Sequence, residues 1–148
     1  MDALELLKQD HKAVKELFEQ AEGTEDQATK KQIFVNIQTE LEAHARIEET
    51  VFYPAMEKRK ELEGMVAESR KEHQQIKTLL KQLDSSSPEH DEFDANLASL
   101  MDCVEHHAEE EEEGKMFPKV RQVFNQQELD QLGQELKAAK NDGQRKAS

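Results

Sequence analysis

The chain has 148 residues, a length that suits one domain built around a single hydrophobic core. Charged residues make up 36% and apolar residues 35%, and the formal charge of −13 repels nucleic-acid phosphates and anionic membranes but attracts cations. We therefore expect no nucleic acid and no membrane among its partners. The single cysteine, Cys103, excludes an internal disulfide. Neither a signal peptide nor an apolar run of about eighteen residues is present, so we expect a cytoplasmic protein.

Helix formers such as Glu, Lys, Gln, Leu and Ala dominate, and the period-two alternation of a strand is absent, so we predict helices throughout. Asp2 can cap a first helix, which the segment 22–27 interrupts. Thr24 can cap the second helix. Pro54 should kink or locally break that helix, which we expect to finish within residues 56–62.

A third helix is expected to begin near Gly64. The segment DSSSPEH (84–90) is the clearest loop of the sequence, with Ser87 as a suitable N-cap and Pro88 at the first helical position. A fourth amphipathic helix then continues until Pro118 interrupts it near its end.

The segment NQQE (125–128) has the form of a capping box and predicts a short helix to about Lys140, followed by a frayed polar tail. Long amphipathic helices joined by short loops predict an all-α fold, an antiparallel up-down-up-down four-helix bundle. We assign the bundle to residues 1–124, and the short C-terminal helix with its tail to residues 125–148.

Two stretches of the chain follow the same order. HARIEETVFYP (44–54) and HHAEEEEEGKMFP (106–118) both begin with histidine, place glutamate about one helical turn later, and end with an aromatic residue before proline. The first lies in the second predicted helix and the other in the fourth, so the repeat predicts two helical hairpins related by a pseudo-twofold axis. We interpret the aromatic–proline pairs as structural caps at one end of the bundle.

Four of the six histidines lie in phase with the apolar stripes, one on each predicted helix: His11, His44, His73 and His107. Glu48 follows one of them by a turn and points the same way, and a glutamate of the acidic run 109–113 does so after another. Burying such carboxylates and imidazoles is costly unless partners compensate. A pair of divalent metal ions meets this need, because carboxylate and imidazole are natural ligands of such ions. The sequence therefore predicts a metal centre in the bundle core.

The remaining candidates receive other interpretations. We expect His90 to lie at the surface, in the predicted loop, and His106 to be a supporting group beside the ligands. The run 109–113 is mainly a solvated helical face, of which at most one or two members can point inward. Cys103 is expected to be a packing residue.

The complete pattern resembles the hemerythrin family, and in particular the bacterial hemerythrin-like HHE cation-binding domains, over roughly residues 1–124. The stretches that carry the resemblance are HKAVKELF (11–18), EETVFYP (48–54) and EHHAEEEEEGKMFP (105–118). The resemblance implies a non-haem di-iron centre of two iron ions, with the four in-phase histidines as terminal ligands and two bridging glutamates. Zinc or manganese is accepted by such a ligand set as well. The resemblance also implies that the short C-terminal helix is a family addition. It further implies that the ligand is dioxygen, nitric oxide or peroxide.

One departure from the family pattern concerns the third helix. Oxygen-carrying hemerythrins have a second histidine there, one turn after the first, where this chain has Lys77. The chain thus supplies four histidines rather than five, and an additional open coordination position favours reactivity or sensing over stable oxygen carriage. His106 and Glu49 are the residues that could swing into the gap, although neither lies on an apolar stripe.

A second departure concerns register. From the histidine to the closing proline there are ten residues in the first stretch and eleven after His107 in the second, so one extra residue must be absorbed, for example by a π-bulge. If it lies after the glutamate, the ligand is Glu111, which ideal helical phase prefers. If it lies before, the ligand is Glu112, which alignment of the Phe-Pro pairs prefers. We favour Glu111 slightly and keep both.

These expectations lead to a di-iron binding module that takes up dioxygen or a related diatomic ligand as a sensor, scavenger or store. The alternative is a di-iron enzyme that decomposes peroxide or reduces nitric oxide, with Tyr53 or the run 109–113 as the available proton donors. A metal-free helical scaffold is a third hypothesis, and it predicts a melting temperature that ignores chelators. No particular protein partner is indicated.

Overall fold

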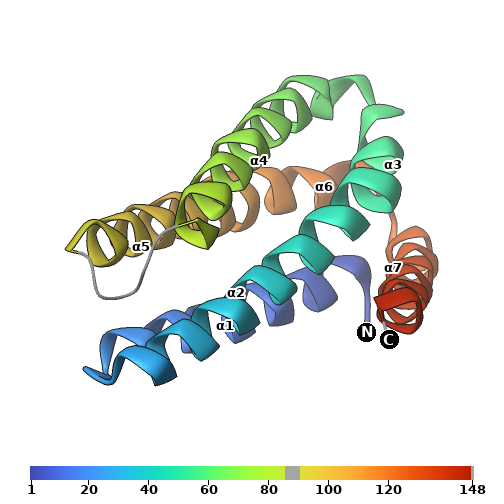
Figure 1. Cartoon of the computed structure of the whole chain (residues 1–148). Coiled ribbons are helices and arrows are strands. Elements are labelled where there is room, and N and C mark those ends of the chain that lie inside the picture. The colour runs from blue at the N-terminus through green and yellow to red at the C-terminus, as the bar shows by residue number, and fades with distance from the viewer. Residues whose placement is uncertain (86–90, 148) are drawn as a thin grey trace.

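The computed structural model describes residues 1–85 and 91–147, and every regular element within these ranges is a helix. α1 (Ala3–Glu22) packs along α2 (Gln27–Ile47), and α4 (Glu63–Asp84) packs along α5 (Asp91–Glu105). Figure 1 shows these two helical pairs side by side, with the C-terminal helix crossing one end. The predicted all-α bundle of two antiparallel hairpins is confirmed.

The second and fourth helices of the bundle each contain a π-helical segment. α2 continues into η1 (Glu48–Phe52) and α3 (Tyr53–Glu57), and α5 continues into η3 (His106–Met116) and α6 (Phe117–Val123). In a π-helix the backbone N–H donates five residues back instead of four, so a turn takes in an extra residue. The extra residue predicted for the fourth helix is accommodated in this way, and the second helix has a shorter segment of the same kind.

Pro54 does not interrupt the second helix where expected. The winding changes from α to π at Glu48, before the proline, and Pro54 falls in the first turn of α3. Tyr53 N–H donates to the Glu48 carbonyl, so the π-helical turn closes before the residue that lacks an N–H. Phe117 N–H makes the equivalent bond to Glu112. Each aromatic–proline pair therefore ends a π-helical segment rather than a helix.

Of the N-caps predicted for the first two helices, one is confirmed and the other lies two residues from the observed cap. Asp2 caps α1 as predicted, because its Oδ1 accepts a hydrogen bond from Glu5 N–H at 2.9 Å. α2 is capped by Asp26, which accepts from Thr29 N–H at 2.9 Å, so the assignment to Thr24 is wrong. Thr24 lies too early in the chain, and its hydroxyl accepts from Asp26 N–H instead.

The third helix begins within one residue of the predicted Gly64, after a short 3₁₀ turn, η2 (Lys60–Leu62). The expected loop that follows it lies largely outside the described residues, and the Ser87 cap, Pro88 and His90 with it.

α7 (Gln126–Ala147) is longer than the short C-terminal helix predicted, and it continues past Lys140. Its capping box is confirmed, since Asn125 N–H donates to Glu128 Oε1 at 3.0 Å and Glu128 N–H donates to Asn125 Oδ1 at 2.8 Å. Three leucines of α7 are buried against the bundle. Gly133 permits this close approach, because a Cβ atom there would lie 2.6 Å from the Met1 carbonyl oxygen. Burial along one face holds α7 against the bundle over the part of the helix before Lys140.

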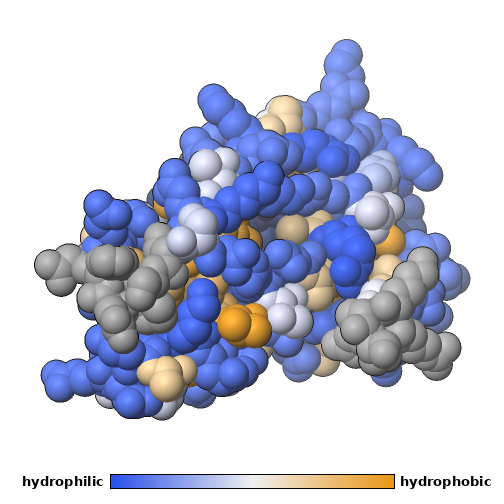
Figure 2. All heavy atoms as spheres, in the orientation of Figure 1, coloured by the Kyte–Doolittle hydropathy of each residue, from blue (hydrophilic) through white to orange (hydrophobic). Residues whose placement is uncertain are grey.

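A polar layer divides the hydrophobic core into two clusters, one packed by α7 and the other at the opposite end of the bundle. On each of the four long helices the in-phase histidine lies between a residue of one cluster and a residue of the other. The face in Figure 2 is largely hydrophilic, and the large apolar side chains found exposed among the described residues are Met1 and Val35. Within the same residues, no helix has the length and apolar character to cross a bilayer.

Candidate metal centre

The four in-phase histidines converge on one buried space, although they come from four different helical segments. They are His11 of α1, His44 of α2, His73 of α4 and His107 of η3. At most 9% of any of these side chains is exposed. Each imidazole turns its Nε2 atom inward, toward the fully buried carboxylates of Glu48 and Glu112. We call these six residues the cage; their role as metal ligands stays a prediction.

Two groups of potential ligands share the cage. In the first, His11 Nε2 lies 3.1 Å from Glu112 Oε1, and His44 Nε2 lies 3.1 Å from Glu48 Oε1. In the second, His73 Nε2 lies 3.0 Å from the same Glu48 oxygen and 3.1 Å from His107 Nε2. Because Glu48 belongs to both groups, the arrangement suits two neighbouring ions with two imidazoles each and carboxylate between them.

Glu112, and not Glu111, points into the cage. Glu112 is fully buried, whereas Glu111 faces outward, is 18% exposed and accepts from Lys115 Nζ at 3.0 Å. The slight preference for Glu111 is therefore wrong. The reason is the π-helical winding of η3, in which His107 and Glu112, five residues apart, return to the same face.

A second set of carboxylates holds the imidazoles from outside, and the sequence analysis did not assign it. Each Nδ1 atom lies within hydrogen-bonding distance of a carboxylate from a different helical segment: His11 with Glu113 at 2.7 Å, His44 with Asp10 at 2.9 Å, His73 with Glu49 at 2.9 Å, and His107 with Glu72 at 2.8 Å. A carboxylate in this position keeps the proton on Nδ1, so that the Nε2 lone pair faces the centre. Each of the four directly neighbours a cage residue in the sequence. An acidic residue next to a cage residue could therefore have been recognised as a candidate from the sequence. The sequence does not tell which imidazole it holds.

Charged groups balance one another inside the cage. Burial lowers the pKa of His44, but the charge of Glu48 and the hydrogen bond with Asp10 outweigh it and raise that pKa to about 10. Burial also lowers the pKa of His107, which the charge of Glu112 raises well above its usual value. Burial raises the pKa of both carboxyls, and the positive His44 then holds the pKa of Glu48 well below its usual range while that of Glu112 stays raised. Divalent ions can replace these protons as the counter-charge of the carboxylates.

Two buried polar atoms of the cage make no hydrogen bond of good geometry within the described part of the chain: Glu48 Oε2, and His44 Nε2, which has only the ion-pair contact with Glu48 Oε1 at 3.1 Å. Such atoms are normally satisfied, and an orphaned one costs about 1–3 kcal/mol. An imidazole nitrogen and a carboxylate oxygen are both suitable ligand atoms for divalent first-row metals. The residues present therefore fit a metal centre.

The family model for the hemerythrin HHE cation-binding domain matches residues 2–120, a range that contains the whole cage. The chain belongs to this family. The HHE domain is a cation-binding domain, and the histidine and glutamate groups of the cage are where this chain offers buried ligands for cations.

Two relatives extend this finding. A protein named DNA nickase from Nostoc sp. (strain PCC 7120) is 31% identical over 141 residues, which are 95% of this chain but 40% of that protein. The chain thus spans about two fifths of the length of this curated relative. The crystal structure of a hemerythrin HHE cation binding domain-containing protein, the Rv2633c homolog from Mycobacterium kansasii, matches with a TM-score of 0.84 and 27% identity. The match covers 96% of this chain and 86% of that one, so it includes most of α7.

This HHE domain places a phenol beside the second ligand group. Tyr53 Oη donates to Glu112 Oε2 at 2.8 Å and lies 3.2 Å from His73 Nε2, so Tyr53 is more than the structural cap expected. The equivalent Phe117 has no hydroxyl and stacks on His11 with ring centroids 6.2 Å apart. Burial and the negative charge of Glu112 raise the pKa of Tyr53 well above its usual value, so the phenol keeps its proton.

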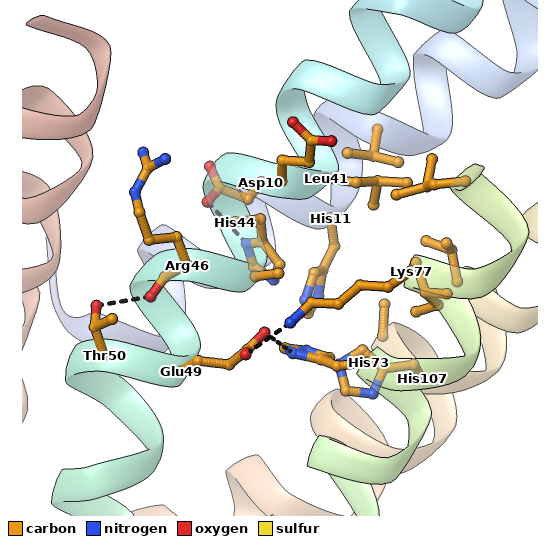
Figure 3. A pocket seen from close by; sticks show the side chains of 17 residues that line it. Asp10, His11, Leu41, His44, Arg46, Glu49, Thr50, His73, Lys77 and His107 are labelled. Atoms are coloured by element: carbon orange, nitrogen blue, oxygen red, sulfur yellow. Dashed lines mark hydrogen bonds and ion pairs between the residues drawn. The ribbon is translucent and has the colours of Figure 1, made fainter. Parts of the chain in front are cut away.

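A cavity of about 300 Å³ reaches the cage from the side of α2 and α4 (Figure 3). All four cage histidines line it, and aliphatic side chains supply much of the rest: Val14, Leu41, Ile76, Leu80 and Val104. Lys77 extends across it and donates to Glu49 Oε1 at 2.9 Å, while the other oxygen of Glu49 pairs with His73. Glu49 therefore supports His73 from outside the cage and does not take the place of a fifth histidine. His106 is 49% exposed and points to Glu72, so it does not do so either.

Proposed function

We propose that this HHE domain holds two non-haem iron ions in its cage and binds dioxygen or a related diatomic ligand as a sensor, scavenger or store. The observation that carries the proposal is the cavity that reaches all four imidazoles, with aliphatic side chains along part of its wall and charged side chains such as Lys77 and Glu49 along the rest. A small diatomic molecule can pass such a cavity and reach the imidazoles, and the aliphatic part of the wall suits an apolar ligand.

The cage residues divide naturally between two ions. His11 and His44 would hold one ion, and His73 and His107 the other, with Glu48 and Glu112 shared. Two imidazoles and shared carboxylates leave coordination positions for an exogenous ligand. A di-iron pair supplies the electrons that reversible uptake of dioxygen requires. Zinc or manganese fits the same ligand atoms, but zinc has no redox chemistry.

The chain itself would orient the imidazoles and limit access of water. The outer carboxylates hold each Nδ1, so the ligand atoms are in place before an ion arrives. The two hydrophobic clusters close the cage above and below, and the cavities that reach it among the described residues lie at its sides: the one lined by all four histidines and another of about 360 Å³ lined in part by His11. A protected site of this kind slows loss of a bound diatomic ligand to side reactions with water.

Metal analysis of natively purified protein, combined with visible absorption spectra in air and under reductant, tests this proposal. We expect two iron ions per chain, an absorption change on reduction that reverses when dioxygen is added, and a different new absorption when nitric oxide is added to the reduced protein instead. A chelator-stripped sample is the control and should be colourless. Less than one iron ion per chain, with no spectral response to either gas, would contradict the proposal.

Tyr53 favours an alternative, an enzyme that decomposes peroxide or reduces nitric oxide. Its hydroxyl lies at the second ligand group, within hydrogen-bonding distance of Glu112 and His73, so it is placed to act as a general acid. Tyr53→Phe removes this proton donor but keeps the ring, and should slow peroxide decomposition about 10²–10⁴-fold with unchanged iron content. Oxygen evolution after addition of peroxide is the measurement. Wild-type turnover no faster than that of free iron would eliminate the enzyme.

We propose no nucleic-acid partner for this domain. The name DNA nickase belongs to a relative of which this chain spans 40%. The formal charge of −13 opposes binding to a phosphate backbone. A mobility-shift experiment with duplex DNA at low salt should show no complex, and a shift at micromolar protein would contradict this expectation.

A further inference from the structure

Another group of metal-ligating side chains lies outside the cage, on α4 and η3. Glu72, His106 and Glu111 each offer one ligand atom, and these atoms lie within 4.8 Å of one another. His106 Nε2 is 3.3 Å from Glu72 Oε2 and 3.5 Å from Glu111 Oε1. Charge-assisted hydrogen bonds are shorter, about 2.7–2.9 Å. Two ligand atoms about 2.1 Å from one ion at a tetrahedral angle stand about 3.4 Å apart, so the observed separations fit shared coordination.

The group is oriented in the same way as the cage. His106 Nδ1 lies 2.9 Å from Glu110 Oε2, a contact that keeps the proton on Nδ1 and directs the Nε2 lone pair toward Glu72 and Glu111. Glu72 is fixed in place, because its side chain is 8% exposed and its other oxygen pairs with His107 Nδ1 at 2.8 Å. With a neutral imidazole, the two carboxylates balance the charge of one divalent cation.

An ion can reach this group from solvent. His106 is 49% exposed, and a cavity of about 180 Å³ lined in part by Glu72 and His106 adjoins it. A water molecule takes about 30 Å³, so this space accommodates the waters that would complete the coordination of an ion. Glu111 Oε1 also accepts from Lys115, but the lysine is 63% exposed and such surface pairs are weak. Lys115 can therefore turn away when a cation arrives.

Asp10 is the residue of the first hairpin that corresponds to Glu72. There the place of a possible outer ion is taken by a lysine. Asp10 holds His44 as Glu72 holds His107, and Lys140 of α7 donates to the remaining oxygen of Asp10 at 2.6 Å. An ammonium group already supplies the positive charge there, and it has no lone pair for a metal. At Glu72 the partner is His106, whose imidazole does have one.

We propose that Glu72, His106 and Glu111 form an outer site for a divalent first-row cation such as manganese, iron(II) or zinc, with water completing its coordination. The outer site shares no ligand with the cage and is joined to it through Glu72 alone. An ion held there lies next to the carboxylate that orients His107.

Manganese alone is the probe. Protein whose cage is loaded with iron is passed over a chelating resin and titrated with manganese, and the free ion is measured by electron paramagnetic resonance. We expect one additional manganese ion per chain. Glu111→Gln should weaken its binding at least tenfold and leave the cage iron in place. Glu109→Gln removes the same charge from the same segment, at a 50% exposed side chain paired with Lys15, and should bind manganese like the wild type.

Wild-type protein that takes up no additional manganese would overturn the outer site, as would equal binding by the Glu111→Gln and Glu109→Gln variants. Loss of cage iron in Glu111→Gln would overturn it too, because Glu111 would then be a cage ligand. His44→Ala separates this proposal from the proposed function. Its cage is expected to be incomplete, yet the variant should keep the manganese site.

Discussion

The rings of His11 and His44, from the first hairpin, meet with centroids 4.9 Å apart and planes at 69°, and those of His73 and His107, from the second, meet at 4.7 Å and 69°. The outer carboxylates repeat this correspondence, because Asp10 and Glu72 each directly precede one histidine of a pair and hold the other. The two hairpins therefore place equivalent residues toward the centre of the cage. The surroundings of these residues differ between the two hairpins.

The two hairpins differ in the residues that surround the cage residues. The second ligand group has the hydroxyl of Tyr53, where the first has the ring of Phe117. The first has the ammonium of Lys140, where the second has the imidazole of His106. The comparison teaches that the two hairpins repeat the buried histidines and carboxylates of the cage, while the residues around these groups differ between the hairpins.

The largest effect is expected from Glu48→Ala, because Glu48 is shared by both ligand groups. Each ion loses a ligand, and the imidazoles lose the charge that compensates their burial. Metal analysis should show that stoichiometric two-metal loading is lost. Glu111→Ala, on the outward side of η3, is the control and should keep both cage ions. Two ions per chain in Glu48→Ala would mean that the hairpins do not build a common centre.

Asp10→Asn and Glu72→Gln test the equivalence of the outer carboxylates. Each removes the negative partner of one histidine, and loss of such a partner typically weakens metal affinity about 10–100-fold. Competition with a chromogenic chelator should give similar losses for both variants. Asp10→Asn should also lower the melting temperature more, because it removes the partner of Lys140 and loosens α7. Wild-type affinity in either variant would break the correspondence.

The raised pKa of His44 predicts how the stability of chelator-stripped protein depends on pH. An imidazole with a pKa of 6.5 in the unfolded chain and about 10 in the folded one stabilises the fold fully below pH 6.5. This contribution is lost as the pH rises through about 10, so urea unfolding should become easier across that window. One proton changes the free energy of unfolding by at most about 1.4 kcal/mol per pH unit.

His44→Gln is the control for this pH dependence and should flatten the slope between those two pH values. Metal-loaded protein should behave oppositely, because metal binding displaces protons and tightens as the pH rises. An unchanged slope in His44→Gln would assign the pH dependence to other groups.

The smallest effect is expected from two lysines at equivalent positions. Lys77 follows His73 by one turn and crosses the cavity to Glu49, while Lys15 follows His11 by one turn and pairs with Glu109 at the surface. In stopped-flow measurements on iron-loaded protein, Lys77→Met should change the rate of azide binding several-fold, because a charge at the rim of a site mainly alters association. Lys15→Met should leave it unchanged, because the ion pair of Lys15 with Glu109 lies at the surface, away from the cavity that Lys77 crosses. Equal rates in the two variants would show that Lys77 does not influence entry.

Helical phase was enough to find the inward histidines, because side chains three and four residues apart share a face wherever the helix is regular. The same rule failed in η3, where π-helical winding carries Glu112 inward and leaves Glu111 outside. Alignment of the two aromatic–proline pairs predicts Glu112, which is the inward residue. In both segments the N–H of the aromatic residue donates to the carbonyl of the inward glutamate five residues before it. A repeat compared with itself was therefore a better guide here than an ideal helix.

The sequence by itself determined the helices, the caps at Asp2 and Asn125, the in-phase histidines and the motifs of the family, because each depends on residues close together along the chain. Only the tertiary structure decided which carboxylate holds which imidazole, that the Tyr53 hydroxyl reaches the cage, and that α7 supplies Lys140 to Asp10. These contacts join segments from different helices. Their partners depend on which faces pack together, and a periodicity along one helix carries no information about its neighbour.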